Sequence, residues 1–212
     1  MTTPTATPST ERGRRTRDAL VTAARRVFET RGYAGTRMQD VAAEAGVSHG
    51  TVYTWFGSKD ELLSEVTHAI VGEVVDASRE RPREASSVDP YERLASATSR
   101  FMAGYRRNAR MLAVVEEAAS ADAEWATLLD QLREIYVERT RRTLHRLQDE
   151  GVVAPDIRPD LAAPALTGMV ETFARRTAAD PTTPDADTEQ LTRLWARSVG
   201  MPVPPADPPQ RT

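Results

Sequence analysis

The sequence contains no cysteine and no long apolar run. Without cysteine there can be no disulfide framework, thiol nucleophile or thiolate metal site, and this composition favours a cytoplasmic protein. No run of about 18 consecutive apolar residues occurs, so the sequence predicts no membrane-spanning helix. The first ten residues, MTTPTATPST, lack the apolar core of a signal peptide, which also favours the cytoplasm.

Catalytic and metal-binding patterns are equally scarce. The three histidines are scattered along the chain, at positions 49, 68 and 145. Glu65 and His68 have the Glu-x-x-His spacing of di-iron helical bundles, but such a site needs a second copy, and the matching position before His145 is Arg142. The sequence therefore predicts no metal site, no cofactor and no enzymatic activity.

Helical periodicity is what the sequence does contain, and it begins near the N-terminus. Apolar residues at three- and four-residue spacing predict an amphipathic helix over residues 16–30, which Gly32 ends. Thr36 and Gln39 then form a capping-box pattern that opens a short second helix. Gly46 favours a left-handed turn after this helix, so a third helix must follow almost at once.

The third predicted helix covers residues 48–56, and Ser48 can cap it. It is about 12 Å long, close to the width of the major groove of B-DNA, and its exposed face carries small and polar side chains. Ser58 and Glu61 repeat the capping-box pattern and start a fourth helix. Lys59 lies in its first turn, where the helix dipole and the free amides suit a phosphate group.

The spacing of Ala42, Gly46 and Val52 is typical of a helix-turn-helix, which needs a small residue where the helices touch, a glycine in the turn and a branched apolar residue underneath. The wider run over residues 32–63, GYAGTRMQDVAAEAGVSHGTVYTWFGSKDELL, closely resembles the DNA-binding region of TetR-type transcriptional repressors. The residues that carry this resemblance are Gly32, Tyr33, Thr36, Asp40, Val41, Ala42, Ala45, Gly46, Val47, Ser48, Gly50, Thr51, Tyr53, Phe56, Ser58, Lys59, Glu61 and Leu62.

The resemblance implies which side chains meet DNA. His49, Gly50 and Tyr53 are expected at the base edges. Phosphate contacts are expected from Thr51, Trp55 and Lys59, and further support at the helix starts from Thr36 and Ser48. Two positions depart from the common pattern, because Thr54 stands where a second aromatic residue is frequent and Trp55 where a histidine is frequent.

Charge is divided unevenly along the sequence. Residues 1–60 hold nine Lys and Arg against six Asp and Glu, whereas residues 61–212 hold 19 against 25. The basic part contains the predicted DNA reader, and Lys59, the only lysine beside 27 arginines, stands at the family's phosphate-contacting position. Residues 1–15 are predicted to form a flexible basic arm, which either tracks phosphates or is merely a soluble tail. The basic cluster at its end consists of Arg12, Arg14, Arg15 and Arg17.

The rest of the sequence has helical patterns and no strand pattern. Further helices are predicted over residues 59–79, 89–105, 110–118, 121–150, 162–173 and 187–198. The predicted fold is therefore all-α, with about nine helices. It divides into a helix-turn-helix DNA-binding domain over residues 16–62, a helical-bundle ligand-binding and dimerisation domain over residues 63–200, and a flexible Pro-rich tail over residues 201–212.

The resemblance also implies a homodimer, in which the last two helices pair with their copies in a second subunit. A twofold dimer places two recognition helices in successive major grooves of double-stranded DNA and matches a palindromic operator. The interface residues predicted on this basis are Leu166, Met169, Val170, Phe173, Leu191, Leu194 and Trp195. The alternative is that these side chains only complete the core of one chain.

A small, largely apolar effector between the helices of the second domain is a further implication of the resemblance. Its candidate pocket residues are His68, Phe101, Met102, Tyr105, Met111, Trp125, Tyr136, Met169 and Phe173. Each of them is alternatively an ordinary core residue, because every helical bundle has apolar stripes. The predicted function is transcriptional repression that a small molecule relieves. The alternative is a helix-turn-helix activator or architectural protein without a ligand.

Overall fold

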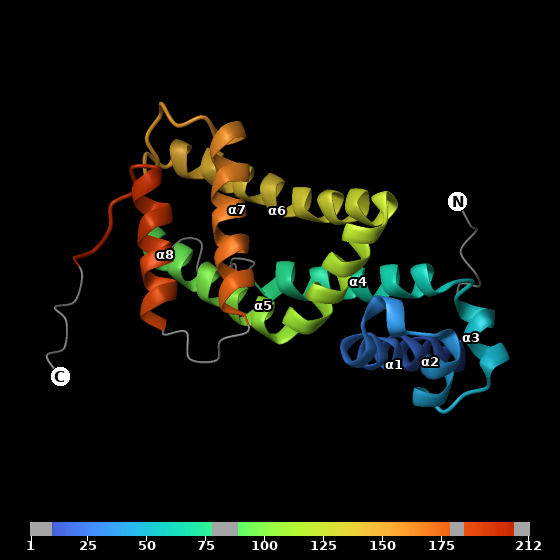
Figure 1. Cartoon of the computed structure of the whole chain (residues 1–212). Helices are drawn as coiled ribbons and strands as arrows, with labels where there is room; N and C mark the ends of the chain where they lie inside the picture. The colour runs from blue at the N-terminus through green and yellow to red at the C-terminus, as the bar shows by residue number, and fades with distance from the viewer. Residues whose placement is uncertain (1–9, 78–88, 179–184, 206–212) are drawn as a thin grey trace, which may run out of the picture. The chain divides into compact units, whose positions relative to one another are not determined.

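A computed structural model describes residues 10–77, 89–178 and 185–205 of the 212-residue chain. Within these ranges the regular secondary structure is entirely helical, which confirms the predicted all-α fold (Figure 1). The helices are α1 (Glu11–Gly35), α2 (Met38–Glu44), α3 (His49–Trp55), α4 (Lys59–Ala77), α5 (Pro90–Ala121), α6 (Ala123–Asp149), α7 (Pro159–Thr177) and α8 (Asp185–Ser198).

Helix α1 begins before the predicted residue 16. Thr10 caps it, because the Thr10 hydroxyl accepts the N–H of Gly13 at 3.1 Å. Glu11 in the first turn forms ion pairs with Arg14 and Arg15, and its negative charge suits the positive end of the helix dipole. The last part of the predicted flexible arm is therefore the first turn of a helix. The preceding residues 1–9 lie outside the described ranges.

Helix α5 runs without a break, whereas the sequence pattern predicts two helices here, over residues 89–105 and 110–118. The predicted break is wrong because the polar residues between these ranges are compatible with a continuous helix. Asn108 is completely buried, and its side-chain oxygen accepts a hydrogen bond from Arg25 of α1 at 2.7 Å. A buried polar side chain with a partner interrupts an apolar stripe without interrupting the helix that carries it.

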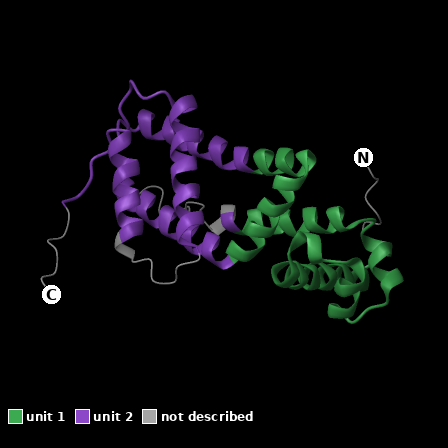
Figure 2. Cartoon of the chain, in the orientation of Figure 1, with its two compact units in different colours: residues 1–73, 108–132 green, residues 74–107, 133–212 purple. Residues whose placement is uncertain are grey.

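The chain forms two compact units (Figure 2). The first unit contains residues 1–73 and 108–132, and the second contains residues 74–107 and 133–212. This division does not follow the predicted boundary after Leu62. The C-terminal part of α5 and the start of α6 belong with the predicted DNA reader.

The core of the first unit joins α1 to α4 with the included parts of α5 and α6. We call the predicted DNA-binding domain over residues 16–62 the reader, and its largest fully buried side chains are Leu20, Phe28, Val41, Val52, Phe56 and Leu62. Met111 and Val115 of α5 and Trp125 of α6 complete the same core. Full burial of one such side chain contributes about 1.5–3 kcal/mol. The reader is therefore stabilised in part by helices far beyond residue 62.

The core of the second unit is built from α5 to α8 and the segments that join or follow them. Its buried members are Tyr91, Leu144, Leu147, Val153, Ala163, Leu166, Trp195, Ala196, Val199 and Met201. Arg193 of α8 donates hydrogen bonds to the carbonyl groups of Pro204 and Pro205 at 2.7 and 3.3 Å. The start of the predicted Pro-rich tail is therefore held against α8. Residues 206–212 of that tail lie outside the described ranges.

Candidate nucleic-acid interface and ligand cavity

The turn between α2 and α3 fixes the direction of the predicted recognition helix. Gly46 has a φ of +67°, in the left-handed region where glycine carries no steric penalty. The N–H of Val47 donates to the carbonyl of Ala42 at 3.0 Å and closes the end of α2. The turn predicted from Gly46 is therefore present.

Helix α3 is held in place at its start and along one face. The Ser48 hydroxyl accepts the N–H of Thr51 at 3.3 Å and lies 2.8 Å from the Thr51 hydroxyl. Val52 and Phe56, one turn apart, are fully buried against the core of the first unit. The cap and these two apolar side chains leave the other face of α3 available to a ligand.

The exposed face of α3 carries the three residues predicted at base edges. His49, Gly50 and Tyr53 are all exposed, and Tyr53 as a whole residue keeps 44% of its accessible surface. The His49 and Tyr53 rings meet edge to face with their centroids 5.0 Å apart, so each restrains the other. A Cβ placed on Gly50 would meet no atom within 4 Å. This face of α3 is therefore accessible, and it presents the paired rings of His49 and Tyr53 next to a glycine that has no side chain.

Two other predicted DNA-binding residues, Thr36 and Trp55, are less exposed than this face of α3. Thr36 is buried, and its hydroxyl donates to the carbonyl of Gly32 at 2.7 Å. The predicted capping box of Thr36 and Gln39 is wrong, because α2 starts one residue later and the Asp40 carboxylate accepts the N–H of Arg37 at 3.2 Å. Trp55 is partly buried and packs against the core of the first unit. Thr36 therefore stabilises the turn between α1 and α2, and Trp55 anchors the end of α3 to the core of the first unit.

Lys59 is held at the end of α1. Its ammonium donates to the carbonyl of Tyr33 at 2.9 Å and lies 4.0 Å from the centroid of the Tyr33 ring. The start of α4, where Lys59 lies, is also fixed, because the Ser58 hydroxyl accepts the N–H of Glu61 at 3.1 Å. An ammonium has three N–H donors, so the contact with Tyr33 leaves donors for a further acceptor. The lysine is thus positioned rather than mobile.

Asp60 joins three helices of the first unit. Its carboxylate accepts hydrogen bonds from the Tyr33 hydroxyl of α1 and, at 2.9 Å, from the Trp125 indole of α6. Burial by itself raises the pKa of the Asp60 carboxyl, but the hydrogen bonds from Tyr33 and Trp125 and the charge of Lys59 outweigh it, and the pKa is lowered. Burial and the same hydrogen bond to Asp60 raise the pKa of Tyr33 to about 12.

The Asp60 cluster should make the first unit sensitive to acid. The pKa of Asp60 is lower in the folded chain than in the unfolded chain, where it is about 3.9. The carboxylate therefore stabilises the fold above about pH 4, and this stabilisation is lost as the pH falls through the folded pKa. In urea unfolding, the free-energy deficit of the Asp60→Asn variant against the parent protein should be constant near neutral pH and shrink in acid.

Tyr33→Phe is the matched control for this prediction. It removes one donor to Asp60 and keeps both the ring and the carboxylate. The loss of unfolding free energy in Tyr33→Phe should therefore also depend on pH, but it should change less with pH than the loss in Asp60→Asn. A deficit of Asp60→Asn that stayed the same from neutral pH down to about pH 3 would show that the carboxylate does not stabilise the fold.

Glu117 of α5 supports the interruption in α1. Gly32 has a φ of +70° inside α1, so the predicted end of the helix at this glycine is present as a kink. The Glu117 carboxylate accepts the N–H groups of Tyr33 at 3.1 Å and Ala34 at 3.2 Å. One of its oxygens lies only 2.9 Å from where a Cβ on Gly32 would stand. No sequence pattern predicts this contact, because Glu117 has no fixed spacing from Gly32.

Residues 46–50, GVSHG, match the letters of the G-x-S-x-G motif of α/β-hydrolases. In that motif the serine lies on a sharp turn between a strand and a helix. Here α2 precedes the segment, and Ser48 caps α3 with its hydroxyl bonded to Thr51. The match is therefore one of letters only, and Ser48 is a capping residue.

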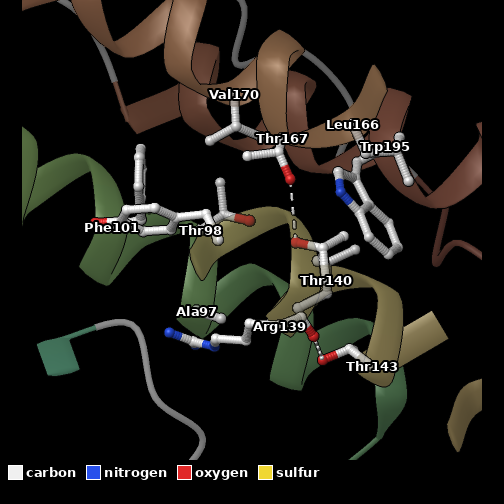
Figure 3. A pocket seen from close by; sticks show the side chains of 12 residues that line it. Ala97, Thr98, Phe101, Arg139, Thr140, Thr143, Leu166, Thr167, Val170 and Trp195 are labelled. Carbon is white, nitrogen blue, oxygen red and sulfur yellow. Dashed lines mark hydrogen bonds between the residues drawn. The ribbon is translucent and has the colours of Figure 1, made fainter. Parts of the chain in front are cut away.

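A cavity of about 140 Å³ lies among the helices of the second unit (Figure 3). Its lining residues are Leu94, Ala97, Thr98, Phe101, Tyr136, Arg139, Thr140, Thr143, Leu166, Thr167, Val170 and Trp195. The Thr167 hydroxyl of α7 donates to the Thr140 hydroxyl of α6 at 3.2 Å. Most of the surface that lines the cavity is apolar. Its hydroxyl groups and the guanidinium of Arg139 can orient a bound molecule.

Two of the predicted pocket residues line this cavity, Phe101 and Tyr136. Four others belong to the second unit without lining it, namely Met102, Tyr105, Met169 and Phe173. The remaining three belong to the first unit, namely His68, Met111 and Trp125. Met111 and Trp125 are core residues there, whereas His68 is exposed and its Nδ1 contacts the carbonyl of Ser64 at 2.8 Å.

The residues predicted at the dimer interface fall into three groups, which line the cavity, are buried or partly buried elsewhere, or are exposed. Three of them line the cavity, namely Leu166, Val170 and Trp195. Leu191 is buried, and Met169 and Phe173 are partly buried. Leu194 of α8 is 59% exposed, and Leu161 of α7, which was not among the predicted residues, is 60% exposed. Large apolar surface therefore remains on both of the last two helices.

The described residues carry neither of two other kinds of site. No described helix is both long enough and apolar enough to cross a membrane. Among the same residues, no group of three His, Asp or Glu side chains is placed to hold a metal ion.

Two family models match the sequence. The model for bacterial regulatory proteins of the tetR family matches residues 20–66, and the model for the tetracyclin repressor-like C-terminal domain matches residues 87–175. The chain belongs to the TetR family. It is therefore a DNA-binding transcriptional regulator and not an enzyme, which confirms both predictions.

Proteins similar to this TetR-family chain are also transcriptional regulators of the helix-turn-helix type. The chain is 26% identical to the HTH-type transcriptional regulator EthR of Mycolicibacterium smegmatis over 85% of its own length and 84% of that protein. It is 29% identical to the HTH-type transcriptional repressor KstR2 of the same organism over 73% of each chain. The crystal structure of the TetR-family regulator PfmR from Thermus thermophilus shares the fold, with a TM-score of 0.66 and 23% identity over 84% of this chain and 97% of that one.

Proposed function

We propose that this protein is a ligand-responsive repressor, which binds a palindromic DNA operator as a homodimer and is released by a small molecule. The observation that carries the proposal is the exposed face of α3. His49, Gly50 and Tyr53 lie on this face, and the opposite face is anchored by Val52 and Phe56. A rigid helix with an open polar face is what direct readout of the major groove requires. Lys59 and the exposed start of α3 supply donors for phosphates.

The exposed leucines of the last two helices support a homodimer. Leu161 and Leu194 keep about 60% of their surface, and such large apolar side chains gather where a partner covers them. A single α3 is about 10 Å long and reaches few base pairs. Two copies related by a twofold axis read a longer, palindromic site in successive turns of DNA.

The cavity of the second unit supports release by a small molecule. Helix α4 belongs to the first unit up to residue 73 and to the second unit from residue 74. A ligand that favours one position of the second unit can therefore act on the reader through a continuous helix. We expect the ligand to change the separation of the two α3 helices in the dimer and so to weaken operator binding.

Tyr53→Ala tests the reader directly. The change should weaken operator binding about 10- to 100-fold, because one base contact contributes about 1–3 kcal/mol and 1.4 kcal/mol is a factor of ten. The fold and the dimer should persist, since the side chain is exposed. Fluorescence anisotropy on duplexes from upstream of the protein's own gene measures affinity, and sedimentation velocity measures the dimer.

Tyr53→Phe is the matched control, because it keeps the ring beside His49 and removes only the hydroxyl. Unchanged affinity in the alanine variant would remove Tyr53 from the interface. Equal affinity of the parent protein for palindromic and scrambled duplexes would contradict specific repression. A monomer in sedimentation, with and without DNA, would contradict the homodimer.

A further inference from the structure

Tyr33 joins the predicted phosphate contact, Lys59, to the rest of the first unit. The Tyr33 carbonyl accepts a hydrogen bond from the Lys59 ammonium at 2.9 Å, and the centroid of the Tyr33 ring lies 4.0 Å from the same nitrogen. Lys59 is only partly buried, and an ammonium has three N–H donors. One donor is therefore directed to Tyr33 while the others can reach a phosphate. The place of the ammonium depends on both the carbonyl and the ring of Tyr33.

Glu117 of α5 fixes the peptide that carries this carbonyl. Its carboxylate accepts the N–H of Tyr33 at 3.1 Å with one oxygen and the N–H of Ala34 at 3.2 Å with the other. The N–H of Ala34 and the carbonyl of Tyr33 belong to the same peptide unit, which is planar and rigid. A carboxylate that holds the N–H on one edge of this plane therefore also sets the direction of the carbonyl on the opposite edge.

Trp125 of α6 fixes the ring. Its indole N–H donates at 2.9 Å to the Asp60 oxygen that also accepts the Tyr33 hydroxyl. The rings of Trp125 and Tyr33 are in addition only 6.4 Å apart, between centroids. Trp125 is 5% exposed and packs in the core of the first unit, so its N–H has a fixed direction. The Asp60 oxygen is therefore held in place, and with it the ring on which the Lys59 ammonium lies.

We propose that Glu117 and Trp125 are positioning residues for the contact between Lys59 and DNA phosphate. Glu117 acts through the peptide between Tyr33 and Ala34, and Trp125 acts through the Tyr33 ring. Operator affinity then depends on two side chains of α5 and α6, which lie outside the helix-turn-helix. This inference rests on the proposed function, because it takes Lys59 as a contact to the phosphates of the operator.

The only lysine of the chain supplies a test that needs no DNA. In full-length protein labelled with ¹³C-lysine, the NMR signals of the ε-methylene group belong to Lys59 alone, and the Tyr33 ring should displace them from their unfolded-chain position. Trp125→Phe keeps an aromatic ring and removes the N–H. Glu117→Gln leaves one oxygen acceptor where two are used. Both variants should move the Lys59 signals toward the unfolded-chain position.

Matched controls make the same chemical changes elsewhere. Trp195→Phe alters an equally buried tryptophan in the core of the second unit. Glu124→Gln removes one negative charge from an exposed side chain of α6. Both controls should leave the Lys59 signals at the parent position. Thermal unfolding shows that each variant is folded at the temperature of the measurement.

The salt dependence of operator binding tests the same residues on DNA. Lys59→Gln should lower the slope of log affinity against log salt by about 0.9 per subunit, the value for one neutralised phosphate. Trp125→Phe and Glu117→Gln should each weaken binding about two- to tenfold, the net effect of one hydrogen bond, and lower the slope by part of that amount. In a Lys59→Gln background, neither should change affinity or slope further. Mere loss of stability in a folded variant would leave the parent slope.

Several outcomes would overturn the positioning role. Lys59 signals that stayed at the parent position in both folded variants would do so without DNA. Losses of affinity that added to the loss in Lys59→Gln would also do so. An unchanged slope in Lys59→Gln would overturn it while specific operator binding, and hence the proposed function, stood. A parent protein without operator preference, in which both variants still moved the Lys59 signals and lowered the slope on nonspecific DNA, would overturn the proposed function and support the positioning role.

Discussion

Replacing Gly50 with leucine should abolish operator binding while the fold remains intact. A Cβ at Gly50 meets no atom within 4 Å, so the free protein has room for a larger side chain. Glycine within a helix also costs about 1 kcal/mol relative to alanine, which favours the replacement. Against DNA, the added bulk should hold α3 away from the bases. Loss of two or three base contacts, at about 1–3 kcal/mol each, lowers affinity by about 100-fold or more.

Gly72→Leu is the matched control in α4, where an added Cβ likewise meets no atom within 4 Å. It should leave operator affinity unchanged, and Gly50→Ala should have an intermediate effect. Anisotropy on the operator measures binding, and thermal unfolding shows that each variant is folded. Parental affinity in a folded Gly50→Leu variant would show that this face of α3 does not approach the bases.

Trp125→Ala should destabilise the DNA-reading unit by about 3–5 kcal/mol, although the residue lies far from α3 in the sequence. Trp125 is 5% exposed, and it shares one core with Phe28, Phe56 and Leu62. The change also removes the indole N–H that Asp60 accepts. Domains are stable by only about 5–15 kcal/mol, so this loss is a large fraction of the total. Urea unfolding measures it, and limited proteolysis within α1 to α3 reports opening of the reader.

Trp195→Ala is the control for Trp125→Ala, because it deletes the same side chain from the core of the second unit, where Trp195 is also 5% exposed. Its cost in stability should be similar, but cleavage within α1 to α3 should stay slow. Equal cleavage of the reader in the two variants would show that residues 108–132 do not stabilise it.

Local features of the reader could be predicted from the sequence because each depends on a few neighbouring residues. Gly46 fixes its own turn, Ser48 caps the next helix, and Val52 marks the buried face of α3. The start of α2 shows the limit of such patterns. Thr36-x-x-Gln39 and Arg37-x-x-Asp40 differ by one residue, and the second is used because the Thr36 hydroxyl is bonded to Gly32.

Contacts between distant segments could not be predicted in this way. Asp60 and Trp125 are 65 residues apart, and Glu117 lies 84 residues from Tyr33. Hydrogen bonds of this kind leave no periodic trace in a sequence, whereas apolar faces do.

The cavity of the second unit was predicted only in part, because apolar stripes were the only guide. Arg139 lines this cavity and lies three residues after Tyr136, on the same face of α6. Arginine at positions of an apolar stripe was the available signal, since a charged side chain among core positions needs a partner. The apolar stripes did predict Phe101 and Tyr136, which both line the cavity.

The first unit is assembled from two stretches that are not continuous in the chain, and this has a consequence during synthesis. When residue 73 leaves the ribosome, Met111 and Trp125 have not yet emerged, and the apolar faces of α1 to α4 lack these partners. At about 5–20 residues per second, the chain needs about 3–12 s more to reach residue 132. A nascent polypeptide therefore carries a complete recognition helix for several seconds before the unit that holds it can close.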